Sequence, residues 1–144
     1  MKSKLGLTYP VLLLEPQSIA FTDTKTGILD TQNFGSAEIQ IHYGTMASVA
    51  AGEKVIGVLQ ESDLLTDVSF ATVATTDADG AFTMVDGTSD DSCIQRVAYI
   101  GGKRYVRVLL EFTGSAITGP VGVVGILGRP SVAPIPAQTA KAAT

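Results

Sequence analysis

Apolar and polar residues alternate strictly in the segment 36–44, SAEIQIHYG. Successive side chains of a β-strand point to opposite faces of the sheet, so this pattern predicts a half-buried strand. The expected inward-facing side chains are Ala37, Ile39, Ile41 and Tyr43, and the expected outward-facing ones are Glu38, Gln40 and His42.

Further strands are predicted by other runs of apolar or alternating residues, at 53–62, 66–73, 93–100, 103–112 and 119–128. Gly101 and Gly102 join two of these runs, which favours a hairpin because glycine accepts the positive φ of primed turns. The segment 75–92 is rich in Asp and Gly and is expected to form turns. Helix-tolerant residues gather only at 45–55, where Gly52 interrupts them, so we expect a loop there.

About seven or eight short strands with turns at fairly regular spacing predict an all-β fold, a single-domain β-sandwich or jelly-roll-like barrel. An immunoglobulin-like sandwich fits the same pattern. We expect an extended N-terminal arm at 1–16, a β-sandwich domain at 17–135 and a flexible, Pro/Ala-rich C-terminal tail at 136–144. No run approaches the ~18 apolar residues of a membrane span, so we expect no membrane partner.

Basic residues gather unusually in the apolar stretch YIGGKRYVRVLLEF, residues 99–112. A period of two places Arg104 with Val106 and Val108 on a core face, at the strand start where its charge reaches water. The same period places Lys103, Tyr105 and Arg107 on the opposite face. We predict that this opposite face is solvated and that Arg107 pairs with a cross-strand neighbour.

Composition excludes several classes of function. The formal net charge is −4 and the pI is near 4.8, which disfavours direct binding to nucleic acid. Cys93 is the single cysteine and His42 the single histidine, so we expect no catalytic residues, no metal site and no cofactor. The aspartates within 77–91 lack the ligand spacing of a calcium loop and are expected to be solvated turns.

Two apolar stretches stand where polar residues would be expected. One is the proline-bracketed run Val11, Leu12, Leu13 and Leu14, and the other is the pair Leu64 and Leu65 in a predicted turn. Leaving such side chains in water costs roughly 1.5–3 kcal/mol for each one that could be buried. Either both stretches fold back on the protein's own core, or they bury against another chain.

Three motifs carry a family resemblance: GVLQESDLLTDV, QRVAYIGGKRYVRVLLEF and GVVGILGRPSVAP. These motifs resemble those of small decoration (cement) proteins encoded beside the major capsid protein of tailed bacteriophages. The second motif contains the family-motif strand residues Tyr99, Lys103, Arg104, Tyr105 and Arg107. The resemblance covers roughly residues 35–135. This chain departs from the family pattern at Leu64 and Leu65, where Asp, Gly or Ser is usual.

The resemblance implies a structural protein of the virion, located on the outer capsid surface and made in the host cytoplasm. It implies that the major capsid protein is the partner, and that the protein is a homotrimer that stabilises the junctions between capsomers. The family has no catalytic residues to transfer. Two alternatives remain open: a head–tail joining or tail structural protein, and a carbohydrate-binding β-sandwich, which the absence of Trp disfavours.

Overall fold

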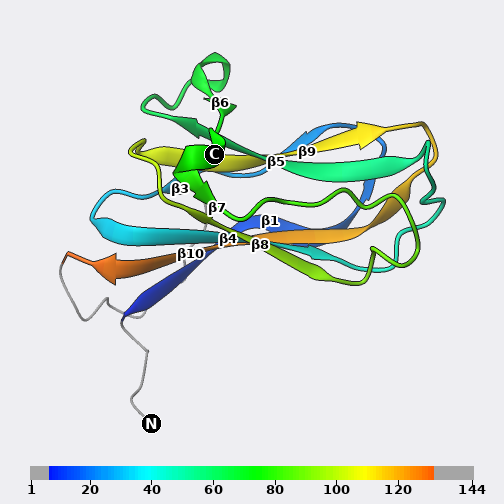
Figure 1. Cartoon of the computed structure of the whole chain (residues 1–144), viewed down its shortest axis with the longest axis horizontal. Helices are drawn as coiled ribbons and strands as arrows, with labels where there is room; N and C mark the ends of the chain where they lie inside the picture. Colours follow the sequence, from blue (N-terminus) through cyan, green and yellow to red (C-terminus); the bar gives the residue numbers. More distant parts are fainter. Residues whose placement is uncertain (1–6, 132–144) are drawn as a thin grey trace, which may run out of the picture.

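The computed structural model describes residues 7–131, which form two antiparallel β-sheets packed face to face (Figure 1). The first sheet has the strand order β1 (Thr8–Ala20), β10 (Thr118–Pro130), β4 (Phe34–Tyr43), β8 (Ile94–Tyr99), β7 (Ala78–Asp79). The second has the order β2 (Thr24–Lys25), β9 (Tyr105–Thr113), β5 (Lys54–Ser62), β6 (Ala71–Thr72), and β3 (Leu29–Asp30) also pairs with β9. Two short 3₁₀ turns, η1 (Asp67–Ser69) and η2 (Thr75–Asp77), flank β6 and β7. The predicted all-β sandwich is confirmed.

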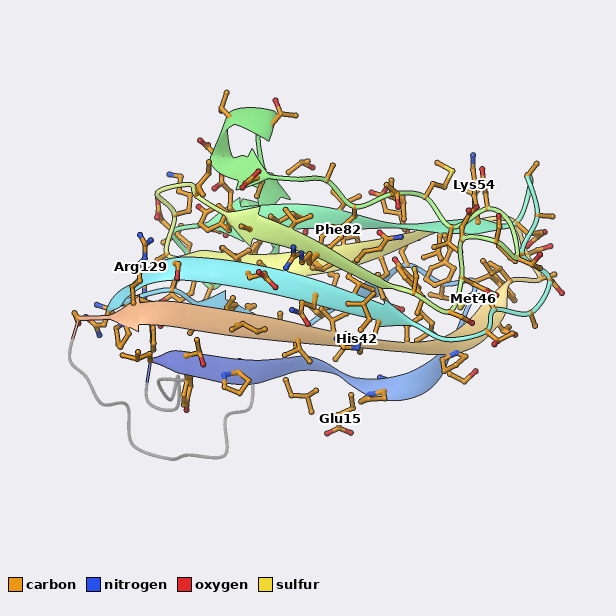
Figure 2. The ribbon with its side chains drawn as sticks, turned by 60° about the horizontal axis from the view of Figure 1, so that its bottom comes forward. Glu15, His42, Met46, Lys54, Phe82 and Arg129 are labelled. Atoms are coloured by element: carbon orange, nitrogen blue, oxygen red, sulfur yellow. The ribbon has the colours of Figure 1, made fainter. Side chains whose placement is uncertain are left out.

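The core fills the space between the two sheets, where inward side chains of both layers meet (Figure 2). On β4, Ala37, Ile39, Ile41 and Tyr43 are all buried, as the alternation predicts. The opposing sheet contributes Val106, Val108 and Leu110 from β9 and Val55 from β5, and all of them are fully buried. Burial of branched side chains from facing strands is the main force that holds the two layers together.

The N-terminal segment is a strand of the sandwich. Residues 8–20 form β1, the edge strand of the first sheet, so the boundary that we expected at residue 16 falls inside an element. Pro10 and Pro16 make this segment look like an arm, but an edge strand tolerates prolines because one side of it needs no ladder bonds. The register shifts between Leu12 and Gln17, on either side of Leu14. The predicted tail at 136–144 lies outside the described residues.

Two further details differ from the sequence prediction. The run 66–73 forms the turn η1 and the two-residue strand β6 in place of a full strand. β8 and β9 lie in different sheets, so Gly101-Gly102 carries the chain between the layers and is not a hairpin turn. Among the described glycines only Gly80 and Gly114 have positive φ. Gly101 is needed for another reason, since a Cβ there would lie 2.6 Å from the Tyr99 ring.

Candidate functional site

The β5–β6 loop, residues 63–70, carries exposed apolar side chains at one end of the sandwich. Leu64 is 61% exposed, Leu65 is 56% exposed and Val68 is 95% exposed, and η1 within the loop buries no residue. Adjacent exposed apolar side chains of this size are the kind of feature that marks a protein-contact surface. Such side chains form a defined surface only where the rest of the protein holds the loop in one conformation.

Arg107 of β9 lies beneath this loop and anchors it. Its side chain is only 7% exposed, so the predicted solvated position is wrong. The guanidinium Nε donates to Gln60 Oε1 at 2.8 Å, a terminal nitrogen donates to the Asp67 carboxylate, and the group lies 4.1 Å over the Phe70 ring. Gln60 is the cross-strand neighbour of Arg107, as predicted. Arg107 is buried because the loop folds back over the outer face of β9, which a strand pattern cannot reveal.

Asp67 joins the loop to a second cation. Lys25 Nζ of β2 donates to Asp67 Oδ2 at 2.6 Å. The bonds from Lys25 and Arg107 hold the pKa of the Asp67 carboxyl below its usual value. The Leu64 N–H donates to Ser62 Oγ at the end of β5 at 2.9 Å, and within the loop Ser69 Oγ donates to the Leu64 carbonyl oxygen at 3.1 Å. The loop is thus tied to three strands and to itself.

A second anchor holds the start of the loop. Lys103 Nζ donates to Asp63 Oδ2 at 2.6 Å, and this bond lowers the pKa of Asp63 and raises that of Lys103. The Lys103 N–H donates to the Tyr99 hydroxyl at 2.8 Å, and that hydroxyl donates to the Glu61 carboxylate. Burial, together with this bond to Glu61, raises the pKa of Tyr99. The link between β8 and β9 is therefore fastened directly to the end of β5.

Arg104 extends the network to the neighbouring β3 turn. It makes a two-pronged ion pair with Asp30 at 3.0 and 2.8 Å, and its guanidinium carbon lies 4.8 Å from the centre of the Tyr105 ring. The bond from Arg104 lowers the pKa of Asp30. The position agrees with the prediction that Arg104 sits at the strand start with access to water. Tyr105 was predicted on the solvated face and is instead buried.

Two of the three motifs of the resemblance therefore form a single cluster. Residues 59–63 and 66–68 supply Gln60, Glu61, Asp63 and Asp67, and residues 99–108 supply Tyr99, Lys103, Arg104 and Arg107. Sequence reasoning singled out the basic strand and Leu64-Leu65 but missed the acidic partners and Val68. The usable signal was charge: acidic residues gather in one motif and basic residues in the other.

The other predicted interface run divides between two faces. Val11 and Leu13 are buried in the protein's own core, so these two side chains cannot contact a partner. Leu12 and Leu14 line an apolar groove of about 460 Å³ beside β10, together with His42. His42 Nε2 is buried there without a hydrogen-bond partner.

Chemistry-bearing residues are sparse in the described part of the chain. Cys93 is partly buried, and its thiol donates to the Asp90 carbonyl oxygen at 3.1 Å. Within residues 7–131, no three His, Cys, Asp or Glu side chains are placed so that they could hold a metal ion. No helix in this range has the length and apolar character needed to span a membrane.

Comparison with known proteins leaves the family open. No family model and no curated protein matches this chain. A solved structure described as Bacillus endospore appendages, a family of disulfide-linked pili, is 13% identical over 85% of this chain and 88% of its own, with a TM-score of 0.41. The SPBc2 prophage-derived protein YomS is 14% identical over 85% of this chain and 93% of its own, with a TM-score of 0.38. A structure of infectious bursal disease virus is 10% identical over 88% of this chain and 34% of its own, with a TM-score of 0.36. These similarities are too distant to bear on function.

Proposed function

We propose that this chain is a structural protein of a tailed-phage virion that binds the outside of the assembled capsid and stabilises the junctions between capsomers. One observation carries the proposal. Residues of two of the three resemblance motifs bond to one another, and together they hold Leu64, Leu65 and Val68 exposed on an anchored loop. The motif residues thus support an apolar surface, and its two leucines, where the chain departs from the family pattern, are the side chains we expect to contact the capsid.

An anchored loop suits such a role for an energetic reason. A loop that is already ordered loses little conformational entropy when it docks, so more of the free energy of apolar burial is available for binding. A protein that binds the assembled shell but not free capsid subunits stabilises the shell by mass action. Many copies, each making a modest contact, can therefore reinforce the weak junctions of a shell under internal pressure.

The test is binding to shells assembled from the major capsid protein encoded with this chain. We expect Leu65→Asp to reduce occupancy of the shell strongly while the isolated domain keeps its stability, because Leu65 is exposed and contributes little to the core. Ile94→Asp is the matched control, since Ile94 is 61% exposed, close to the 56% of Leu65, but lies at the start of β8. Unchanged occupancy for Leu65→Asp, or an equal loss for both variants, would refute the contact.

Three further measurements separate the alternatives. A shell protein is present in many copies for each particle, whereas a head–tail joining protein or a tail protein is present in few, so gel quantitation against the major capsid protein distinguishes them. The homotrimer implied by the resemblance is tested by sedimentation of the free protein and of protein released from shells. A carbohydrate-binding sandwich would instead bind a glycan array, and its binding would not change in Leu65→Asp.

A further inference from the structure

A pocket of about 340 Å³ lies between the β5–β6 loop and the segment that joins β2 to β3. The side chains that line it include three apolar and three charged ones: Ile28, Leu65, Phe70, Lys25, Asp67 and Arg107. Leu65, which is 56% exposed, belongs both to this pocket and to the proposed contact surface. A partner that covers the loop would therefore also cover the pocket.

The charged groups give the pocket an excess of positive charge. Lys25 and Arg107 supply two positive charges and Asp67 supplies one negative charge, so the pocket has a net charge of +1. The whole chain, in contrast, has a formal net charge of −4. Both cations bond to the same Asp67 carboxylate, which means that they lie close enough together to share one. The pocket thus favours an anionic group on the partner.

Both cations also have hydrogen-bond donors to spare. An arginine side chain has five N–H groups. Arg107 uses one of them for Gln60 and two for Asp67, and the other two have no acceptor among residues 7–131, although the side chain is only 7% exposed. The Lys25 ammonium has three N–H groups and donates to Asp67. Unused donors on a buried cation favour an incoming acceptor, because leaving them unpaired is costly.

We propose that this pocket receives an aspartate or glutamate side chain of the protein that the β5–β6 loop contacts. Its carboxylate bonds to Lys25 and Arg107, and its methylene stem lies against Leu65 and Phe70. A neutral apolar side chain would leave the N–H groups unpaired, and a small inorganic anion would leave the apolar wall in water. The inference rests on the proposed function, because it names the chemistry of the partner at the same surface.

Titration of the isotope-labelled protein with sodium hexanoate, followed by amide nuclear magnetic resonance, tests the pocket without any shell. Hexanoate carries a carboxylate on an aliphatic stem. Hexanamide carries the same stem without the charge, and inorganic phosphate carries charge without the stem. We expect hexanoate to shift the amide signals of Gly27, Ile28 and Leu65 with a dissociation constant on the order of millimolar. The two control compounds should shift them far less.

Three variants separate an effect of charge from a loosened loop. Lys25→Gln removes one cation and should bind hexanoate about fivefold more weakly, the effect of one unit charge a few ångström away in water. Asp67→Asn removes the competing negative charge and should bind hexanoate about fivefold more tightly. A loop that had merely come loose would bind more weakly in both variants. Lys54→Gln, at the end of β5 opposite the loop, should bind as wild type does.

Four results would overturn the inference. In two of them hexanamide or phosphate binds as tightly as hexanoate, so that either the charge or the stem is not recognised. In the third, Lys25→Gln binds hexanoate as tightly as wild type does. In the fourth, both Lys25→Gln and Asp67→Asn bind it more weakly, which would mean that the variants act through the loop and not through charge.

Binding to shells then connects the pocket with its partner. At low ionic strength Lys25→Gln should bind shells about fivefold more weakly than Lys54→Gln. This difference should vanish at about 1 M NaCl, where charges are screened beyond about 3 Å. If wild type does not bind shells, the proposed function is refuted, and the hexanoate titration still decides whether the pocket takes a carboxylate. If wild type binds and the two lysine variants bind equally at every salt concentration, only the acidic contact is refuted.

Discussion

Replacing Arg107 with alanine removes the side chain on which the β5–β6 loop rests. The variant loses the bond to Gln60 and the contact with the Phe70 ring. It also loses the burial of the methylene groups of the arginine side chain. A hydrogen bond from a charged group contributes about 1.5–3 kcal/mol, a cation–π contact about 0.5–2 kcal/mol, and a buried methylene about 0.8 kcal/mol.

The ion pair with Asp67 adds less to this total. Asp67 is largely exposed, so after the substitution water solvates its carboxylate again, and its ion pair with Arg107 contributes little to stability. These contributions overlap, because the same guanidinium makes all the contacts. We therefore expect Arg107→Ala to lower the free energy of unfolding by about 2–4 kcal/mol.

Urea unfolding followed by far-ultraviolet circular dichroism measures this loss, because the chain has no Trp to report by fluorescence. Arg96→Ala is the matched control: Arg96 is an exposed strand arginine, and its loss should change stability by less than about 0.5 kcal/mol. A double-mutant cycle with Asp67→Asn should give a coupling energy that is small beside the whole effect of Arg107→Ala. If Arg107→Ala proves no more destabilising than Arg96→Ala, Arg107 does not anchor the loop.

Two further predictions concern the rest of the fold. Gly101→Ala should destabilise the protein by about 1–3 kcal/mol in thermal melts, because its Cβ would meet the Tyr99 ring at 2.6 Å. Gly102→Ala is the control and should be near neutral, because its Cβ would have no atom within 4 Å. The Glu53 carboxylate accepts backbone N–H bonds, chiefly from Ala116, which lower its pKa below the ordinary 4.5. A lowered pKa gives stability that is present above the ordinary pKa and lost as the pH falls through the folded-state pKa. Glu53→Gln should therefore be less stable than wild type at pH 7. Between about pH 5 and pH 2 it should lose less stability than wild type does. Glu111→Gln, on an exposed strand position, should leave both quantities unchanged; a wild-type acid profile for Glu53→Gln would contradict the assignment.

The sequence predicts the parts of this fold that depend on a local period. The alternation on β4 survives in the structure because one face of that strand is buried in the core and the other is only partly covered. The last strand, β10, is also found where its Gly/Val run predicts it. Local patterns fail where a segment distant in sequence covers a strand. Arg107 and Tyr105 are buried although their positions alternate with the core residues.

Other failures have a conformational cause. The run 66–73 has the composition of a strand, but Asp67 and Ser69 find partners only if the chain coils back over β9, and a 3₁₀ turn forms instead. The sequence pattern predicts a turn at Gly101, because a positive φ is one reason for a protein to require glycine. A second reason is the close approach of another group to the glycine Cα. Only the structure shows that close approach to Tyr99 is the one that applies here.

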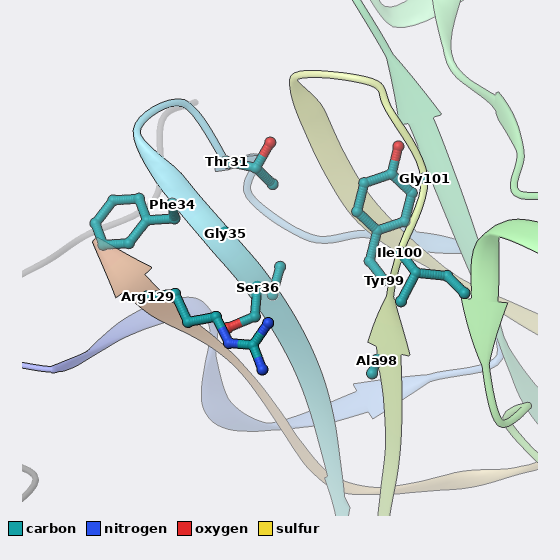
Figure 3. Close-up of a pocket in the computed structure, with 10 residues that line it drawn as sticks. Thr31, Phe34, Gly35, Ser36, Ala98, Tyr99, Ile100, Gly101 and Arg129 are labelled. Atoms are coloured by element: carbon teal, nitrogen blue, oxygen red, sulfur yellow. The ribbon is translucent and has the colours of Figure 1, made fainter. Parts of the chain in front are cut away.

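The β5–β6 loop and a pocket of about 450 Å³ beside the start of β4, lined in part by Thr31, lie at one end of the sandwich and share a support (Figure 3). Asp63 holds Lys103 and Arg104 on the loop side, and the Thr31 hydroxyl donates to the Arg104 carbonyl oxygen at 2.9 Å on the pocket side. A substitution in the link between β8 and β9 would therefore disturb both places and could not separate their roles. Leu65→Asp changes an exposed side chain of the loop and leaves this link intact, so it is the variant that tests the loop by itself.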